Sequence, residues 1–272
     1  MSRRSMQVCA LFALTAFIVL LLPLLIVIGG SFDGSGSAYL RFPPAELTLK
    51  WYRGLPATYI QAFGRSLIIS TSAAVIAAAV GTITALSLAR SSWRRGHFLE
   101  ILFRLPLQIP FVVIGVAFMQ FYYALLDNFD VHLLSTYTGL ITAHVFFCLP
   151  YTVATVGAVI THSLSNIENA ARIAGASEIR VLRRVTLPAL MPGLFSGLFY
   201  AFIISFGDIP VSIFLAETRM QPLPVVIFQT LQFDFDPAVL SASTLVILFS
   251  VALIVVVRQV FGIDLVLRGA KT

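Results

Sequence analysis

The chain has 272 residues, of which 58% are hydrophobic and 11% are charged, and its mean hydropathy is +0.94. Soluble domains carry about a quarter charged residues, so this composition excludes an ordinary soluble protein and indicates an integral membrane protein. A membrane-crossing helix needs about 20 apolar residues, and the length leaves room for about six such spans with loops between them. The formal net charge of +6 does not require a nucleic acid partner, because membrane topology accounts for the basic residues.

The first apolar run covers Val8–Ile28 and follows Arg3 and Arg4. A cleavable signal peptide has an apolar core of about 7 to 15 residues, so this longer run is predicted to be a retained first span. A polar loop, residues 31–59, follows it. We expect a short surface helix within this loop, around Leu47–Gly54.

The second span is predicted at Leu67–Leu88 and the third at Ile101–Leu126. Small residues recur at every fourth position of the second span, a pattern that lets helices pack closely in lipid. They are Ala73, Ala77, Gly81 and Ala85. Pro106 and Pro110 stand near the start of the third span, so that end is expected to be bent and partly solvated.

The fourth span is predicted at Gly139–Ile160 and contains His144. No second His, Cys or carboxylate lies at ligand spacing from it, so we expect a hydrogen bond to a neighbouring helix and no metal site. The two cysteines, Cys9 and Cys148, lie inside apolar runs and do not indicate a disulfide.

The stretch from Ser165 to Pro192 is the most charged part of the chain. Ser165 and Glu168 have the spacing of a capping box, which predicts a helix that begins at Ser165. Gly175 is expected to end this helix, and Ser177 to cap a second, short one. From these local features alone, a basic amphipathic loop lying on anionic lipid headgroups fits as well.

A more specific indication comes from the spacing of Ala170, Ala171, Gly175, Val185 and Leu187-Pro188. It resembles the cytoplasmic coupling loop of the permease subunits of binding-protein-dependent ABC importers, whose pattern is Glu-Ala-Ala, three residues, Gly, nine residues and Ile-x-Leu-Pro. Where that pattern has Glu this chain has Asn169, and Glu168 stands one residue earlier. The resemblance implies ATPase-coupling residues at Glu168, Asn169, Ala170, Ala171, Arg172, Ala174, Gly175, Ala176 and Ser177.

The fifth span is predicted at Leu187–Leu215, with Gly193 and Gly197 forming a helix contact face. Its end, SFGDIPVSIFL, is similar to the polyamine, opine and aminoalkylphosphonate branch of the same family, although that branch often has two adjacent acids and Gly207 takes the first place here. An ionisable residue inside a span is costly and suggests function, so Asp208 is expected to line the solute pathway and attract a cationic group. A structural carboxylate bonded to a helix end is the alternative. The candidate pathway residues are Asp208, Ser205, Phe206, Ser212, Gln120 and Tyr122.

The sixth span is predicted at Ala238–Val257, and a basic tail follows it. Placing the even-numbered loops and both ends on one side collects 13 of the 18 basic residues there. These are Arg3, Arg4, Arg90, Arg94, Arg95, Arg104, Arg172, Arg180, Arg183, Arg184, Arg258, Arg268 and Lys271. Because basic residues accumulate in cytoplasmic loops, we expect both termini and the coupling loop to be cytoplasmic.

The fold expected from this resemblance is an all-α integral membrane protein with about six transmembrane helices, the type I ABC importer permease fold. We expect a first helix and extracytoplasmic loop over residues 1–60, a five-helix core over 61–265 with a coupling loop at 161–187, and a cytoplasmic tail at 266–272. The resemblance implies a bacterial inner-membrane location. The implied partners are a second, identical or homologous permease, two ATPase subunits, an extracytoplasmic solute-binding protein and membrane lipid, with no nucleic acid.

The expected function is import driven by ATP and Mg²⁺ on the partner ATPases, with no cofactor bound by this chain and no enzymatic activity of its own. The sequence contains no Gly-x-x-x-x-Gly-Lys-Ser/Thr phosphate-binding loop. The solute is expected to be a small polar compound, with a cationic polyamine or related amine as the leading class. The alternatives are a phosphonate, ferric iron or opine importer of the same kind, or an ATP-independent secondary transporter. A membrane enzyme is disfavoured because the histidines are scattered.

Overall fold

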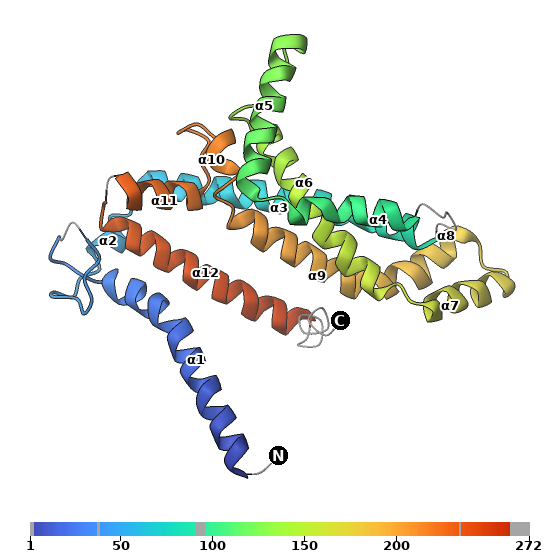
Figure 1. Cartoon of the computed structure of the whole chain (residues 1–272), viewed down its shortest axis with the longest axis horizontal. Helices are drawn as coiled ribbons and strands as arrows, with labels where there is room; N and C mark the ends of the chain where they lie inside the picture. Colours follow the sequence, from blue (N-terminus) through green and yellow to red (C-terminus); the bar gives the residue numbers. More distant parts are fainter. Residues whose placement is uncertain (1–2, 37–38, 91–95, 234, 262–272) are drawn as a thin grey trace. The chain divides into compact units, whose positions relative to one another are not determined.

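The computed structural model describes residues 3–36, 39–90, 96–233 and 235–261 (Figure 1). The regular elements in these ranges are helical, and a single isolated bridge joins Asp33 to Leu47. The helices are α1 (Arg3–Gly30), α2 (Lys50–Arg53), α3 (Ala57–Arg90), α4 (Gly96–Arg104), η1 (Leu105–Gln108), α5 (Phe111–Phe129), α6 (Tyr137–Val159), α7 (His162–Ile173), α8 (Glu178–Val181), η2 (Leu182–Thr186), α9 (Leu187–Phe206), α10 (Ser212–Leu215), α11 (Leu223–Phe233) and α12 (Ala238–Phe261).

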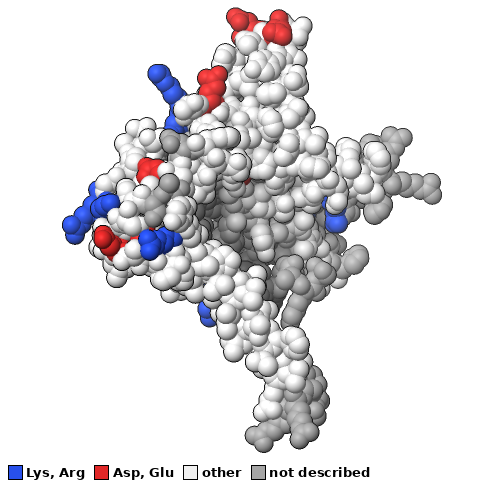
Figure 2. All heavy atoms as spheres, turned by 60° about the vertical axis from the view of Figure 1, so that its left-hand side comes forward, with Lys and Arg blue, Asp and Glu red and all other residues white. Residues whose placement is uncertain are grey.

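Six of these helical segments are long and apolar enough to cross a membrane, which confirms the predicted number of spans. They are Met6–Gly30, Ala57–Arg90, Phe111–Phe129, Tyr137–Val159, Glu178–Phe206 and Ala238–Gln259. Figure 2 shows wide areas of surface without charged side chains, as expected for helices that face lipid.

The chain divides into two compact units. One falls within residues 1–61 and 226–257, and the other within 62–225 and 258–272. The first unit contains α1, the loop after it, α2 and most of α12. The side chains of α1 within Met6–Leu25 are exposed all round, so this helix needs lipid or another chain to cover it.

The loop after α1 is organised around Asp33. Its carboxylate accepts the Ala45 N–H at 2.9 Å and the Ser35 hydroxyl, and its carbonyl accepts the Trp51 Nε1–H at 2.8 Å. The hydrogen bond from Ser35 is the main reason that the pKa of Asp33 lies below its ordinary value. The expected surface helix of this loop is the short α2.

The core of the second unit is the pair α6 and α9. A Cβ atom on Gly193 would lie 2.6 Å from the Thr155 carbonyl oxygen, and one on Gly197 would lie 2.5 Å from the Thr155 hydroxyl. These glycines therefore form the predicted contact face, because only the absence of a side chain permits this approach. A Cβ on Gly81 would likewise lie 2.7 Å from Cβ of Thr152, so the small-residue stripe of α3 packs against α6.

Two predicted spans are interrupted in the structure. The third begins at Phe111 rather than Ile101, because α4 and η1 form a separate segment that ends before Pro110. Ile109 is extended, as expected for a residue before proline. The fifth span ends at Phe206 rather than Leu215, and the short α10 follows the gap that contains Pro210. The predicted start of the third span and the predicted end of the fifth were therefore wrong.

Candidate functional site

The first candidate site is the α7–α8 segment, residues His162–Val181, which adjoins the ends of α6 and α9 in Figure 1. The prediction that its helix begins at Ser165 was wrong, because α7 begins at His162 after Thr161 at the N-cap position. Ser165 lies inside the helix. The Glu168 side chain therefore has no free N-cap N–H from which to accept a hydrogen bond, and its partners lie elsewhere in the chain.

Gly175 ends α7, as predicted. Its φ angle of 84° is in the left-handed region that glycine adopts without strain. The N–H of Gly175 bonds to the Arg172 carbonyl at 2.9 Å and that of Ala176 to the Ala171 carbonyl at 3.0 Å, which satisfies the last carbonyls of the helix. Ser177 is the N-cap residue of α8, as predicted, although its side chain makes no capping bond there.

Arg172 holds this turn in shape. Its guanidinium donates from Nε to Oε1 of Glu178 at 2.7 Å and from Nη2 to Oε2 at 3.1 Å, and Nη1 donates to Oδ1 of Asn169 at 3.0 Å. The hydrogen bond to Glu178 raises the pKa of Arg172, so this side chain stays charged. The forked pair fixes α8 relative to α7 across Gly175.

Glu168 points in the opposite direction, toward the protein interior. Its side chain is 7% exposed, and Oε1 accepts from Nη2 of Arg90 at 2.8 Å and from the hydroxyl of Thr186. Arg90 is the last residue of α3, and Thr186 the last residue of the π-helix η2. No local pattern in the sequence indicates this three-way contact, and we did not predict it.

The outward side of the α7–α8 segment is small and apolar. Ala170, Ala174 and Gly175 are exposed, and so are larger apolar side chains beside them. Ile167 is 56% exposed, Ile173 89%, Ile179 67% and Leu182 43%. Ala171, Arg172 and Ala176 are partly buried, and Asn169 and Ser177 are exposed. Exposed apolar side chains beside polar ones make this surface a candidate for contact with a partner or with lipid headgroups.

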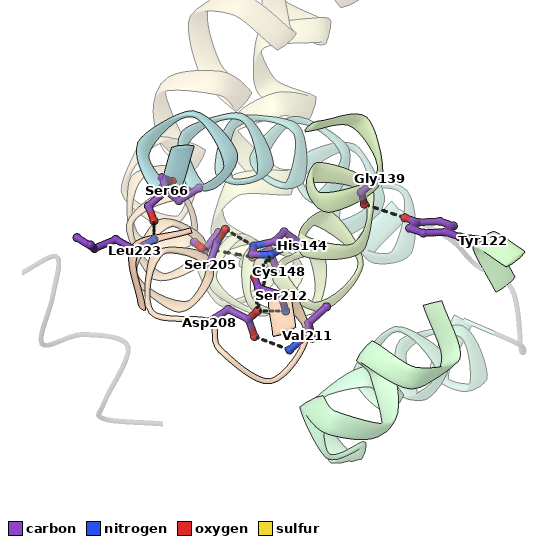
Figure 3. A network of polar contacts seen from close by, with 12 residues as sticks. Ser66, Tyr122, Gly139, His144, Cys148, Ser205, Asp208, Val211, Ser212 and Leu223 are labelled. Atoms are coloured by element: carbon purple, nitrogen blue, oxygen red, sulfur yellow. Dashed lines mark hydrogen bonds and ion pairs between the residues drawn. The ribbon is translucent and has the colours of Figure 1, made fainter. Parts of the chain in front are cut away.

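The second candidate site is a buried polar cluster where α9 gives way to α10 (Figure 3). His144 of α6 contacts the Ser205 hydroxyl through Nδ1 at 2.7 Å and the Ser212 hydroxyl through Nε2 at 3.1 Å. The predicted hydrogen bond from His144 to a neighbouring helix is thereby confirmed. Phe206 is buried beside this cluster and packs against the rings of Phe63 and Phe202.

Asp208 lies at the centre of this cluster. One carboxylate oxygen accepts the Val211 N–H at 3.3 Å, and the other accepts the N–H and the hydroxyl of Ser212, each at 2.8 Å. The second oxygen also lies 3.7 Å from Nε2 of His144, and the Asp208 side chain is 0% exposed. The carboxylate thus fixes the first turn of α10.

The other two predicted pathway residues lie on α5, apart from this cluster. Tyr122 is buried and donates its hydroxyl to the Gly139 carbonyl at 2.7 Å, whereas Gln120 is exposed. Among the described residues no group of three or more His, Cys, Asp or Glu side chains could hold a metal ion.

Known proteins resemble this chain over most of its length. A family model described as "Binding-protein-dependent transport system inner membrane component" matches residues 77–263. The spermidine/putrescine transport system permease protein PotC of Haemophilus influenzae is 30% identical over 259 residues, covering 94% of this chain and 96% of that protein. The putrescine transport system permease protein PotI of Escherichia coli K12 is 29% identical over 240 residues, covering 86% and 83%.

The fold also matches a solved structure. A chain from the crystal structure of a bacterial ABC transporter involved in the import of the acidic polysaccharide alginate superposes with a TM-score of 0.72 at 16% identity. The match covers 96% of this chain and 99% of that one.

Proposed function

Because the chain belongs to the binding-protein-dependent transport system inner membrane components, we propose that its α7–α8 segment couples it to ATPase subunits and that it imports a polyamine. The protein is a multi-pass permease subunit of an ABC importer of the bacterial inner membrane. Family membership thereby favours the importer over an ATP-independent carrier.

One observation carries the coupling proposal: the segment that resembles the coupling loop presents an exposed surface of small and apolar side chains. Ala170, Ala174 and Gly175 allow a partner backbone to approach closely, and Ile173 offers an apolar contact that is 89% exposed. The Arg172–Glu178 pair shapes this surface before any partner arrives, which reduces the ordering cost of binding.

The assembly that we propose has a second, identical or homologous permease, two ATPase subunits and an extracytoplasmic solute-binding protein. ATP and Mg²⁺ would bind to the ATPase subunits, because this sequence lacks a phosphate-binding loop. The α7–α8 segment and both termini would face the cytoplasm, as the distribution of basic residues indicates. ATP-driven movement of the ATPases would then displace α7 and change the access of the pathway.

The polyamine proposal is supported by the relatives, which are named as spermidine/putrescine and putrescine permeases. We further propose that Asp208, with Ser205 and Ser212, serves a pathway for a cationic solute. The geometry sets a condition, because the Asp208 carboxylate is bonded to Val211 and Ser212, lies beside His144, and its side chain is 0% exposed. A solute amine can reach this carboxylate only if α10 moves away from it.

The coupling proposal is tested by co-purification from detergent. The wild-type chain should retain an ATPase and a second permease. Replacing exposed Ala170 with Trp should strongly reduce the retained ATPase, since the bulk would meet only a partner. Ala154→Trp is the matched control, because Ala154 is also an exposed alanine in a helix but lies on α6, outside the α7–α8 segment. Equal retention in the Ala170 and Ala154 variants contradicts the proposal.

The solute proposal is tested with the complete importer in proteoliposomes, using radiolabelled spermidine and putrescine and, for comparison, a phosphonate and ferric iron. Uptake of the amines alone supports the polyamine class. Asp208→Asn should raise the amine concentration that gives half-maximal uptake. An unchanged value in this variant would remove Asp208 from the solute pathway.

A further inference from the structure

The Glu168 carboxylate connects three elements that are distant in sequence. It sits on α7, accepts from Arg90, which stands 78 residues earlier at the end of α3, and accepts from Thr186, 18 residues later at the start of α9. Its side chain is 7% exposed and Thr186 is 0% exposed. The carboxylate is therefore shielded from water although the Arg90 side chain is 48% exposed, whereas in the Arg172–Glu178 pair the carboxylate of Glu178 is 73% exposed.

Burial of the carboxylate makes this contact harder to break than a surface pair. A carboxylate that is 7% exposed and loses its partners keeps much of its desolvation cost, although water reaches the half-exposed Arg90 and reduces the energy of the pair. The exposed Arg172–Glu178 pair contributes less, because water competes for both of its partners.

The position of the contact gives it a mechanical consequence. Between α8 and α9 the chain forms η2, a single stretch of π-helix at Leu182–Thr186. A π-helix is rare and is an irregularity in the helical ladder, at which α7 and α8 could tilt while α9 stays in place. The bond from Thr186 to Glu168 spans this irregular stretch, and the bond from Arg90 adds α3 to the same group.

We propose that Glu168 is a positioning residue that locks α7 to the end of α3 and the start of α9, so that these elements move as one body when an ATPase displaces α7. This inference rests on the coupling function proposed above and assigns Glu168 a role inside the chain, with its carboxylate turned away from the ATPase. The outward face of α7 at Asn166, Asn169, Ala170 and Ile173 is left for the partner.

The test measures whether α7 and α3 keep a fixed distance during the ATP-driven step. Spin labels are placed at the exposed residues Ser165 on α7 and Val75 on α3, in the assembled importer with Cys9 replaced by Ser. Distances are recorded by double electron–electron resonance without nucleotide and after trapping with ATP and orthovanadate. With native Glu168 we expect one narrow distribution that trapping leaves unchanged.

Two variants should weaken the contacts that join α7 to α3 and α9. Glu168→Gln keeps the size and an acceptor oxygen but removes the charge, and Thr186→Val removes only the hydroxyl contact. In each we expect trapping to shift the α7–α3 distance by a few Å or to broaden its distribution. Glu178→Gln is the matched control, because it removes a carboxylate from the same segment that does not touch α3, and its distances should match those of the native protein.

The outcomes separate the inference from the function on which it rests. If the native sample retains no ATPase, the coupling function fails and the inference fails with it. If ATPase is retained but trapping changes the α7–α3 distance of the native protein, only the inference is overturned. The same holds if both releasing variants keep the native distances.

Discussion

The contact between α6 and α9 offers the sharpest test of the packing, through the substitutions Gly193→Ala and Gly197→Ala. Each adds one methyl group to the interface of α6 and α9 at these two glycines (the glycine seam), where the facing atoms are already close. At Gly193 the new Cβ would meet the Thr155 carbonyl oxygen at 2.6 Å, Cγ2 of Val159 at 2.8 Å and Cα of Val156 at 3.0 Å. Two of these three neighbours are backbone atoms, so a rotamer change cannot relieve the clash.

The magnitude follows from these distances. An ordinary contact of a Cβ atom begins at about 3.4 Å, so α9 must withdraw from α6 by several tenths of an ångström along the whole seam. Overpacking of this kind costs about 1–3 kcal/mol. Gly157 in α6 is the matched control, because a Cβ there would meet nothing within 4 Å. Gly157→Ala should instead gain about 0.5–1 kcal/mol from the lower flexibility of alanine.

The assay is thermal unfolding of the purified chain in detergent, followed by tryptophan fluorescence or by loss of the monodisperse peak. We expect both seam variants to melt several degrees below the native protein and Gly157→Ala to melt at or above it. If Gly193→Ala and Gly157→Ala melt at the same temperature, then α6 and α9 do not pack as closely as described, and the reasoning is refuted.

Four further predictions concern polar contacts. His144→Phe keeps a ring of similar size but leaves the Ser205 hydroxyl without its partner, so it should destabilise the chain by about 1–3 kcal/mol. Tyr122→Phe loses only the hydrogen bond to the Gly139 carbonyl, so it should cost about 1 kcal/mol in the same unfolding assay. Because the pKa of Asp33 is lowered from its ordinary value of 3.8, its ionised form is favoured in the ordered loop. The order of the loop should thus be complete above that value and be lost as the pH falls through the lower, folded value, seen as a smaller protection factor of the Ala45 amide. A protection factor that stays unchanged as the pH falls well below 3.8 would contradict this. Arg172→Met should leave the melting temperature unchanged but speed the exchange of the Gly175 and Ala176 amides, and equal exchange rates would show that the Glu178 pair does not hold the turn.

The sequence predicted the number of spans and their packing faces because both depend on local composition. Runs of apolar residues have few alternatives to a membrane helix, and small residues at every fourth position have one physical use between helices in lipid. Accordingly, Gly81, Gly193 and Gly197 lie in helix contacts as expected. Proline also acts locally, so the break near Pro106 and Pro110 could be expected from the sequence.

The boundaries of elements were less predictable. Ser165 and Glu168 match a capping box, but the same spacing occurs inside a helix, and here Arg90 offers Glu168 a charged partner in a buried place. No pattern in the sequence identifies a partner 78 residues away. Residues 216–237 lie between the predicted fifth and sixth spans, yet their apolar part forms α11 (Leu223–Phe233). An apolar run of that length is compatible with loop or helix until its neighbours are known.

The candidate sites, too, could be predicted from the sequence only in part. That His144 would bond to another helix could be predicted from its burial in an apolar run, while Ser205 and Ser212 as its partners depend on how α9 and α10 fold back beside α6. The two roles considered for Asp208 also needed the structure, which shows its bonds to the first turn of α10. The cytoplasmic orientation, the division at residues 60 and 265 and the coupling and pathway roles stay predictions.

The glycine seam of α6 and α9 also affects how the second unit responds to cooling. Contacts that depend on expelling water weaken at low temperature, but between helices in lipid there is no water to expel. The seam is instead held by dispersion forces between closely packed atoms. Cold storage should therefore loosen apolar contacts of the loop after α1, such as that between the rings of Phe32 and Tyr52, before it loosens the pair of helices within the bilayer.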